Sequence, residues 1–114
     1  MDNNINTLDT IFHALADPTR RAVIQKLGQG PATVSELAEP FDMALPSFMK
    51  HLGVLEASGL IGSKKIGRVR TCTIKQMKLT AAELWLDQQR VLWEGRADRL
   101  AKYVETLDFE EKEK

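Results

Sequence analysis

Two short segments decide the fold of this chain: Thr33-Val34-Ser35-Glu36-Leu37-Ala38 and Leu45-Pro46-Ser47-Phe48-Met49-Lys50-His51-Leu52. In the first, a threonine is followed three positions later by a glutamate, which is a capping box and predicts the start of a helix. Pro40 lies two residues beyond this segment and prevents the helix from continuing. Pro46 is tolerated only in the first turn of a helix, so a second helix should begin at residue 44 or 45. The segments therefore predict a short helix, a tight turn and a second helix, which is the helix-turn-helix arrangement.

The second helix of this pair is expected over residues 44–58, with Gly59 as the left-handed residue past its end. It has one apolar and one polar face. Phe48, Leu52 and Leu55 recur at the spacing of one helical face and should pack in the core. The exposed side carries four candidate DNA-contacting residues: Pro46, Ser47, Lys50 and His51. An α-helix fits the major groove of B-DNA, where such side chains meet base edges and phosphates. The simpler alternative is that these four residues face solvent without a partner.

Two segments rich in β-branched residues, 60–66 and 69–74, follow the second helix. Gly67 and Arg68 lie between them, which predicts a two-stranded hairpin with a tight turn. The hairpin carries four further candidate DNA-contacting residues: Lys64, Lys65, Arg68 and Arg70. Arg68 is placed to enter a minor groove, where a narrow groove concentrates negative potential. The other three residues are expected to contact phosphates.

The charge of the chain is unevenly distributed. Sixteen basic and sixteen acidic residues give a net charge of zero, which alone argues weakly against nucleic acid as a partner. Residues 44–78, however, contain seven lysines or arginines and a single acid, Glu56. Such a segment can present a basic face to phosphates while the protein stays neutral, although a solvated basic surface would show the same pattern.

The flanking segments complete a mainly α-helical fold. Apolar residues recur at helical spacing over 4–16, and Asp17-Pro18 begins a second helix that ends near residue 27. A second capping box, Thr80 to Glu83, opens a last helix that ends near residue 107. We expect five helices and a two-stranded wing, that is, a winged helix-turn-helix domain over residues 1–107. A charged, flexible tail is expected over residues 108–114.

The first and last predicted helices carry more apolar side chains than a core of this size can cover. We expect them to form a helical dimer interface with a second copy of the chain, so that two-fold symmetry places the two DNA-contacting helices about one DNA turn apart. The alternative is that both helices pack only on their own core. The candidate interface residues are Leu8, Phe12, Trp85, Leu92, Trp93, Leu100 and Tyr103.

Several other functions lack their sequence signals. No apolar run of about 18 residues offers a membrane span, and no secretory signal begins the chain. The one cysteine, Cys72, excludes an intrachain disulfide, and a reducing cytoplasm is the expected location. We expect Cys72 to be buried, with a redox-sensitive thiol as the alternative. There is no Gly-rich phosphate loop, and Cys72, His13 and His51 lie on separate elements, so we expect no enzyme activity, no cofactor and no metal site.

Three motifs in order resemble those of the ArsR/SmtB-type winged helix-turn-helix repressors. They are the stretch over residues 12–21, the helix-turn-helix over residues 33–38 and 50–61, and Gly67-Arg68 followed by Cys72. The resemblance covers residues 5 to 107 and is nearest to the metal-independent, SdpR-like autorepressors. It implies a homodimeric repressor that binds an operator, often beside its own promoter, and it leaves room for an unidentified small-molecule effector. It also implies that Arg20 or Arg21 contacts the DNA backbone or stabilises the fold.

Three positions of the helix-turn-helix depart from that pattern. Ala44 stands where a serine often caps the second helix, Met49 where serine is common, and Gly53 where arginine is common. Two polar DNA contacts are therefore absent. These departures sustain an alternative function, a winged-helix protein-interaction module with little DNA binding.

Overall fold

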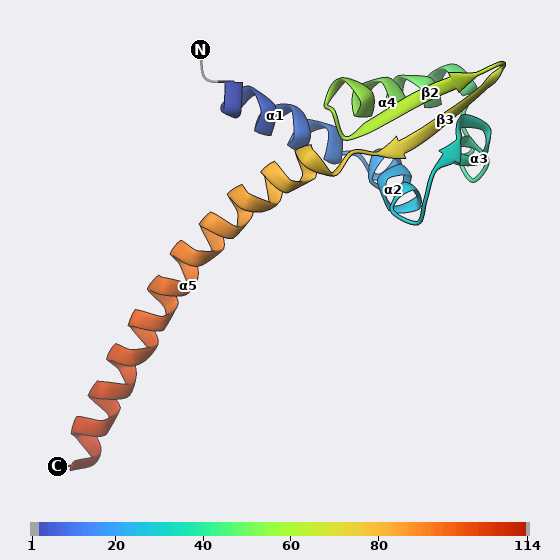
Figure 1. The fold of residues 1–114 in the computed structure, drawn as a ribbon. Coiled ribbons are helices and arrows are strands. Elements are labelled where there is room, and N and C mark those ends of the chain that lie inside the picture. Colours follow the sequence, from blue (N-terminus) through green and yellow to red (C-terminus); the bar gives the residue numbers. More distant parts are fainter. Residues whose placement is uncertain (1–2, 114) are drawn as a thin grey trace. The chain divides into compact units, whose positions relative to one another are not determined.

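The computed structural model describes the backbone of residues 3–113 and the side chains of residues 7–96 and 98–107. The chain divides into two compact units, residues 1–82 and residues 83–114. In chain order (Figure 1) the elements are α1 (Asn3–Leu15), α2 (Pro18–Leu27), β1 (Ala32–Thr33), α3 (Val34–Ala38), α4 (Leu45–Ala57), β2 (Ile61–Ile66), β3 (Val69–Ile74) and α5 (Gln76–Glu113).

The helix-turn-helix consists of α3 and α4, and its start and stop signals act as predicted. The Thr33 hydroxyl accepts a hydrogen bond from the Glu36 N–H at 3.1 Å, and the Glu36 carboxylate accepts one from the Thr33 N–H, which completes the capping box. Pro46 lies in the first turn of α4, and Ala44 at its N-cap supplies no side-chain hydrogen bond. Gly59 follows the helix with a φ of 79°, a left-handed conformation that favours glycine.

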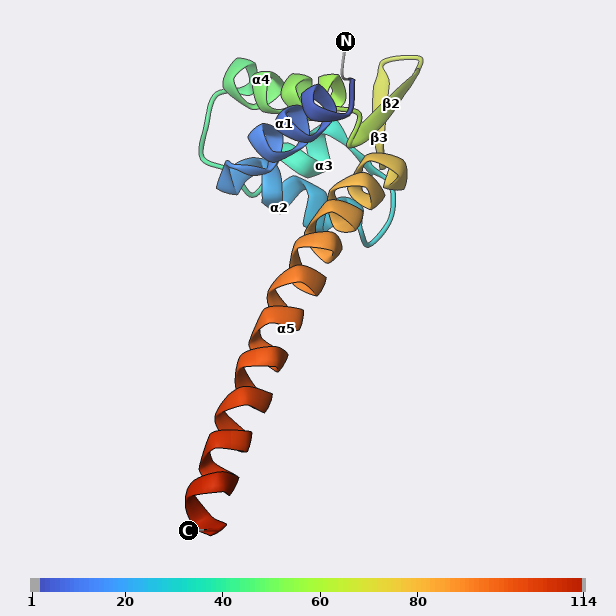
Figure 2. The same ribbon diagram turned by 90° about the vertical axis from the view of Figure 1, so that its left-hand side faces the viewer.

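The sheet has three antiparallel strands in the order β1-β3-β2, where the sequence predicted two. The additional strand, β1, pairs Ala32 with Cys72 and Thr33 with Thr71. A two-residue strand is too short to show the alternation of apolar and polar residues by which strands are predicted. Because Thr33 also caps α3, this pairing ties the base of the wing directly to the helix-turn-helix. The wing is β2, β3 and the turn between them, and it lies beside the helices α1 to α4 (Figure 2).

The core of the first unit lies between the helices and the inner face of the sheet. Phe48, Leu52 and Leu55 of α4 are buried, as their spacing predicted, and α2 and α3 add further buried leucines. Cys72 is fully buried, and its burial raises the pKa of the thiol, as does the Glu56 carboxylate, while Arg70 lowers it. The protonated, packed thiol agrees with a structural role for this cysteine.

The last helix differs from the prediction at both ends. It begins at Gln76, and Thr80 lies within it, since the Thr80 hydroxyl donates to the Gln76 carbonyl at 2.9 Å instead of capping a helix start. Its backbone continues through residues 108–113, whose side chains lie outside the described residues, as does the structure of Lys114. The predicted flexible tail therefore falls on that part of the chain. No helix among the described residues is long and apolar enough to cross a membrane.

Candidate nucleic-acid interface

A surface cleft of about 690 Å³ lies between the helix-turn-helix and the wing. It joins three elements that are separate in the sequence: the start of α3 through Ser35, the middle of α4 through Met49, and the wing through Lys65 and Arg68. The residues that line it are Thr33, Val34, Ser35, Met49, Ser63, Lys65, Arg68, Val69 and Arg70. The cleft thus has a basic wall formed by the wing and a mixed polar and apolar wall formed by α3 and α4.

Six of the eight predicted DNA-contacting residues are exposed. On α4 they are Pro46, Ser47 and Lys50, and on the wing they are Lys64, Lys65 and Arg68. Gly67 has a φ of 63°, which allows the tight turn that carries Arg68 at the tip of the wing. The structure places Lys65 and Arg68 on the same cleft as α4, but it places Lys64 outside that cleft, in a hollow of the wing with Thr71 and Thr73.

Arg70 differs from the other wing cations because its charge is compensated within the domain. Its Nη2 donates to both carboxylate oxygens of Glu56, at 3.0 and 2.9 Å, and its Nε donates to the Ser63 hydroxyl at 2.9 Å. Glu56 lies on α4, so this ion pair connects the wing to the DNA-contacting helix. The single acid of the basic segment is therefore the partner of Arg70.

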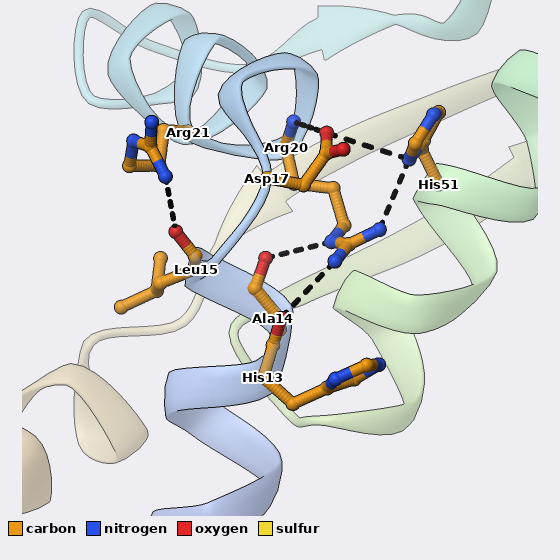
Figure 3. Close-up of polar contacts among 7 residues, drawn as sticks. All are labelled: His13, Ala14, Leu15, Asp17, Arg20, Arg21 and His51. Carbon is orange, nitrogen blue, oxygen red and sulfur yellow. Dashed lines mark hydrogen bonds and ion pairs between the residues drawn. The ribbon is translucent and has the colours of Figure 1, made fainter.

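His51 is half-buried and belongs to a polar cluster at the start of α2 (Figure 3). Its Nδ1 lies 3.1 Å from Nη1 of Arg20 and 3.6 Å from Oδ2 of Asp17. Asp17 also caps α2 by accepting a hydrogen bond from the Arg20 N–H at 3.0 Å. Although desolvation raises the pKa of Asp17, the Arg20 N–H, the charge that His51 carries when its imidazole is protonated, the charge of Arg20 and the Thr19 N–H together hold it below its ordinary value.

Arg20 and Arg21 both bind carbonyl groups at the end of α1. The family resemblance implied either a contact with the DNA backbone or a role in stabilising the fold, and these contacts favour the second. Arg20 donates to the carbonyls of Ala14 at 2.7 Å and His13 at 3.0 Å, and Arg21 donates to the carbonyl of Leu15 at 2.7 Å. The last carbonyls of a helix lack the N–H groups that would follow in a further turn, and among the described residues only the His13 carbonyl of these three also accepts from a nearby backbone N–H, that of Ala16 at 3.2 Å. The sequence signal for this arrangement is an arginine three residues after the N-cap aspartate, but nothing in it indicated the contact with His51.

The predicted dimer residues lie in both units. Leu8 is half-buried and Phe12 is 36% exposed on α1. On α5, Trp85 is 40% exposed, while Leu92, Trp93, Leu100 and Tyr103 are each about 60–70% exposed. Large apolar side chains at such exposure are typical of a helix face that is covered by another chain.

The three side chains that could serve as soft metal ligands, and for which the sequence predicted no metal site, are distributed over α1, α4 and β3. Among the described residues, no group of three histidine, cysteine, aspartate or glutamate side chains is arranged to hold a metal ion. His51 is instead engaged by Arg20, and Cys72 is enclosed in the core.

Comparison with known proteins gives the family. The family model described as a helix-turn-helix domain matches residues 15–62. The HTH-type transcriptional regulator Rv2034 of Mycobacterium tuberculosis is 34% identical over 102 residues, which are 90% of this chain and 90% of that protein. The transcriptional repressor SdpR of Bacillus subtilis is 33% identical over 61 residues, 54% of this chain and 68% of SdpR. The crystal structure of an ArsR family transcriptional regulator, RHA00566, is 64% identical and has a TM-score of 0.75, covering 78% of this chain and 92% of the other. This chain therefore belongs to the ArsR family of winged helix-turn-helix transcriptional regulators, which bind DNA.

Proposed function

We propose that this protein is a homodimeric repressor that places α4 in the major groove of its operator and the wing on the adjacent minor groove and phosphates. One observation carries the proposal: Met49 of α4 and the wing residues Lys65 and Arg68 line the same cleft. A DNA backbone that entered this cleft would have α4 on one side and the wing cations on the other, as in a winged helix-turn-helix complex.

The exposed residues divide into two groups by the contacts they can make. Ser47 and Lys50 lie on the exposed side of α4, where a lysine can donate to guanine O6 or N7 or to a phosphate. Arg68 at the tip of the wing suits a narrow minor groove, and Lys64 and Lys65 suit phosphates. Arg70 is assigned to holding the wing against α4, because Glu56 already compensates its charge.

The dimer is proposed from the apolar side chains of α5. Trp93, Leu100 and Leu107 recur every seven residues, and they are 68%, 65% and 43% exposed. A seven-residue apolar repeat is the pattern by which two helices pack along a common seam. A helix of this length with these side chains in water would be unfavourable, and a second copy of α5 would cover them.

Repression is proposed from the relationship to SdpR, which is named a transcriptional repressor. A dimer bound across two half-sites would occupy DNA that a polymerase needs, without any enzymatic activity.

The test is a measurement of affinity for operator DNA. Fragments are enriched by the purified protein from a random pool and from the region upstream of its own gene, and Kd is measured by fluorescence anisotropy at a fixed salt concentration. We expect Lys50→Ala and Arg68→Ala each to weaken binding by about tenfold or more. Lys102→Ala is the control, because it removes one positive charge from α5, outside the proposed DNA interface.

Two outcomes would count against the proposal. If wild type, Lys50→Ala and Arg68→Ala bind all DNA equally weakly, the alternative of a protein-interaction module replaces it. If Lys102→Ala weakens binding as much as the other two variants, the effect is one of overall charge and the assignment of α4 and the wing is wrong.

A further inference from the structure

Arg20 connects three parts of the domain through one guanidinium group. Its Nε and Nη2 donate to the carbonyls of Ala14 and His13 at the end of α1, and its Nη1 lies 3.1 Å from Nδ1 of His51 on α4 (Figure 3). The end of α1 therefore holds the guanidinium in place, and the third contact fixes the imidazole of a residue on the DNA-contacting helix.

The chemistry of this contact determines which ring nitrogen of His51 carries the proton. A guanidinium group has only donors, so Nδ1 of His51 must accept from it. A neutral imidazole that accepts at Nδ1 carries its proton on Nε2. The competing partner of Nδ1 is the carboxylate of Asp17, which would require a proton on Nδ1, but Oδ2 lies 3.6 Å away, beyond hydrogen-bonding distance.

The other ring nitrogen lies on the far side of the imidazole from Arg20 and Asp17 (Figure 3). His51 follows Ser47 by one helical turn, so the two side chains lie on neighbouring positions of α4. Ser47 is exposed, and His51 keeps 23% of its side chain exposed although its Nδ1 is engaged.

We infer that Arg20 is a positioning residue for DNA binding, which holds His51 with its proton on Nε2 so that α4 offers the DNA a hydrogen-bond donor beside Ser47. The inference rests on the proposed function, because it assumes that α4 contacts DNA. A donor at this position suits an acceptor, either a phosphate oxygen or the O6 and N7 atoms of guanine, and does not suit the amino groups of adenine and cytosine.

The first test is spectroscopic and needs no DNA. Long-range ¹⁵N–¹H correlation spectra of protein labelled in the histidine rings, recorded at about pH 8.5, above the ordinary titration range of imidazole, distinguish the two tautomers. We expect the proton on Nε2 of His51 in wild type and its transfer to Nδ1 in Arg20→Met, where Asp17 is the remaining partner. Arg21→Met is the matched control, since Arg21 also binds a carbonyl at the end of α1 but is not part of the His51 cluster.

The second test measures affinity for the enriched operator. The amide of glutamine reaches about as far as Nε2 of histidine, whereas the shorter amide of asparagine reaches only to the position of Nδ1. We expect His51→Gln to stay within about threefold of wild type, and His51→Asn and Arg20→Met to bind about five- to tenfold more weakly. A loss confined to the operator indicates a guanine acceptor, and an equal loss on unrelated DNA indicates a phosphate.

Three results would overturn the inference: a proton on Nδ1 in wild type, equal losses of affinity in Arg20→Met and Arg21→Met with an unchanged tautomer, or full affinity in His51→Asn. None of these three results contradicts the proposed function. That proposal fails separately if Lys50→Ala and Arg68→Ala leave DNA binding unchanged.

Discussion

The two arginines of the wing form a matched pair, because they are two residues apart on one hairpin and differ in their contacts. Arg70 is bound by Glu56 and Ser63, whereas among the described residues no hydrogen bond or ion pair holds the exposed Arg68. The same substitution to alanine removes one charge from either position. We predict that Arg68→Ala changes DNA binding directly, and that Arg70→Ala acts mainly on the stability of the domain.

The two substitutions should change different quantities: Arg68→Ala the salt dependence of DNA binding, and Arg70→Ala the free energy of unfolding. A cation in the minor groove also neutralises phosphate charge and displaces a counterion, so its removal should make the negative slope of log K against log salt shallower by about 0.9. The affinity deficit of Arg68→Ala should then be about 3.5-fold larger at about 50 mM than at about 200 mM salt. In Arg70→Ala the lost ion pair joins side chains that are 39% and 28% exposed, so solvent screens it. Its loss should lower the free energy of unfolding by up to about 1 kcal/mol, or up to about 4–8 °C in Tm.

The assay is fluorescence anisotropy over a series of salt concentrations, combined with thermal unfolding at one fixed protein concentration, since a dimer's Tm depends on concentration. Glu56→Gln serves as a second way to break the ion pair, and the double variant should lose less stability than the sum of the two single variants. The reasoning would be refuted if Arg70→Ala lowered the salt slope as much as Arg68→Ala and left the Tm unchanged.

Four further predictions address the cap, the left-handed glycine, the core and the dimer. Asp17→Ala should lose about 1 kcal/mol of stability with the N-cap hydrogen bond to Arg20. Because the pKa of Asp17 is lowered in the folded protein, its contribution is present above the unfolded-state pKa and is lost as the pH falls through the folded one, so acid titration of wild type should remove the difference from Asp17→Ala. Gly59→Ala should cost about 1–2 kcal/mol in denaturant unfolding, since φ is 79°, and an unchanged midpoint would contradict the left-handed conformation. Cys72→Ser should cost about 1–3 kcal/mol by placing a hydroxyl in a fully buried site, and a neutral effect would show that the hydroxyl finds a partner there. Leu100→Glu should shift the protein from dimer to monomer in light scattering at micromolar concentration, and an undiminished dimer would exclude this part of α5 from the interface.

The parts of the fold that sequence reasoning predicted correctly depend on residues close together in the chain. The capping box spans Thr33 to Glu36, the start of α4 follows from Pro46, and its end follows from Gly59. Each signal acts through a hydrogen bond or a steric limit within about one helical turn, so the local order of residues is enough. The same local logic failed at Thr80, where an identical capping pattern lies inside α5, because a helix that begins earlier already binds that hydroxyl.

The features that sequence reasoning missed depend on contacts between distant residues. Strand β1 exists only because its two residues pair with β3, about forty positions later. The predicted DNA contacts Arg70 and His51 proved to have partners on other elements, since Glu56 lies 14 positions from Arg70 and Arg20 lies 31 positions from His51. Composition and spacing show that a polar side chain is present, but they do not show whether another residue of the folded domain already binds it.

Order along the chain thus determined the helices of the DNA-binding motif, the basic wing and, through a shared pattern of residues, the family. Packing determined which of the basic and imidazole side chains remain available to DNA: Lys50 and Arg68 stay exposed, while Arg70 is held and His51 is oriented. The physical reason is that helix caps and turns arise from neighbours in sequence, whereas hydrogen-bond partners of long side chains are chosen among groups that only folding brings together.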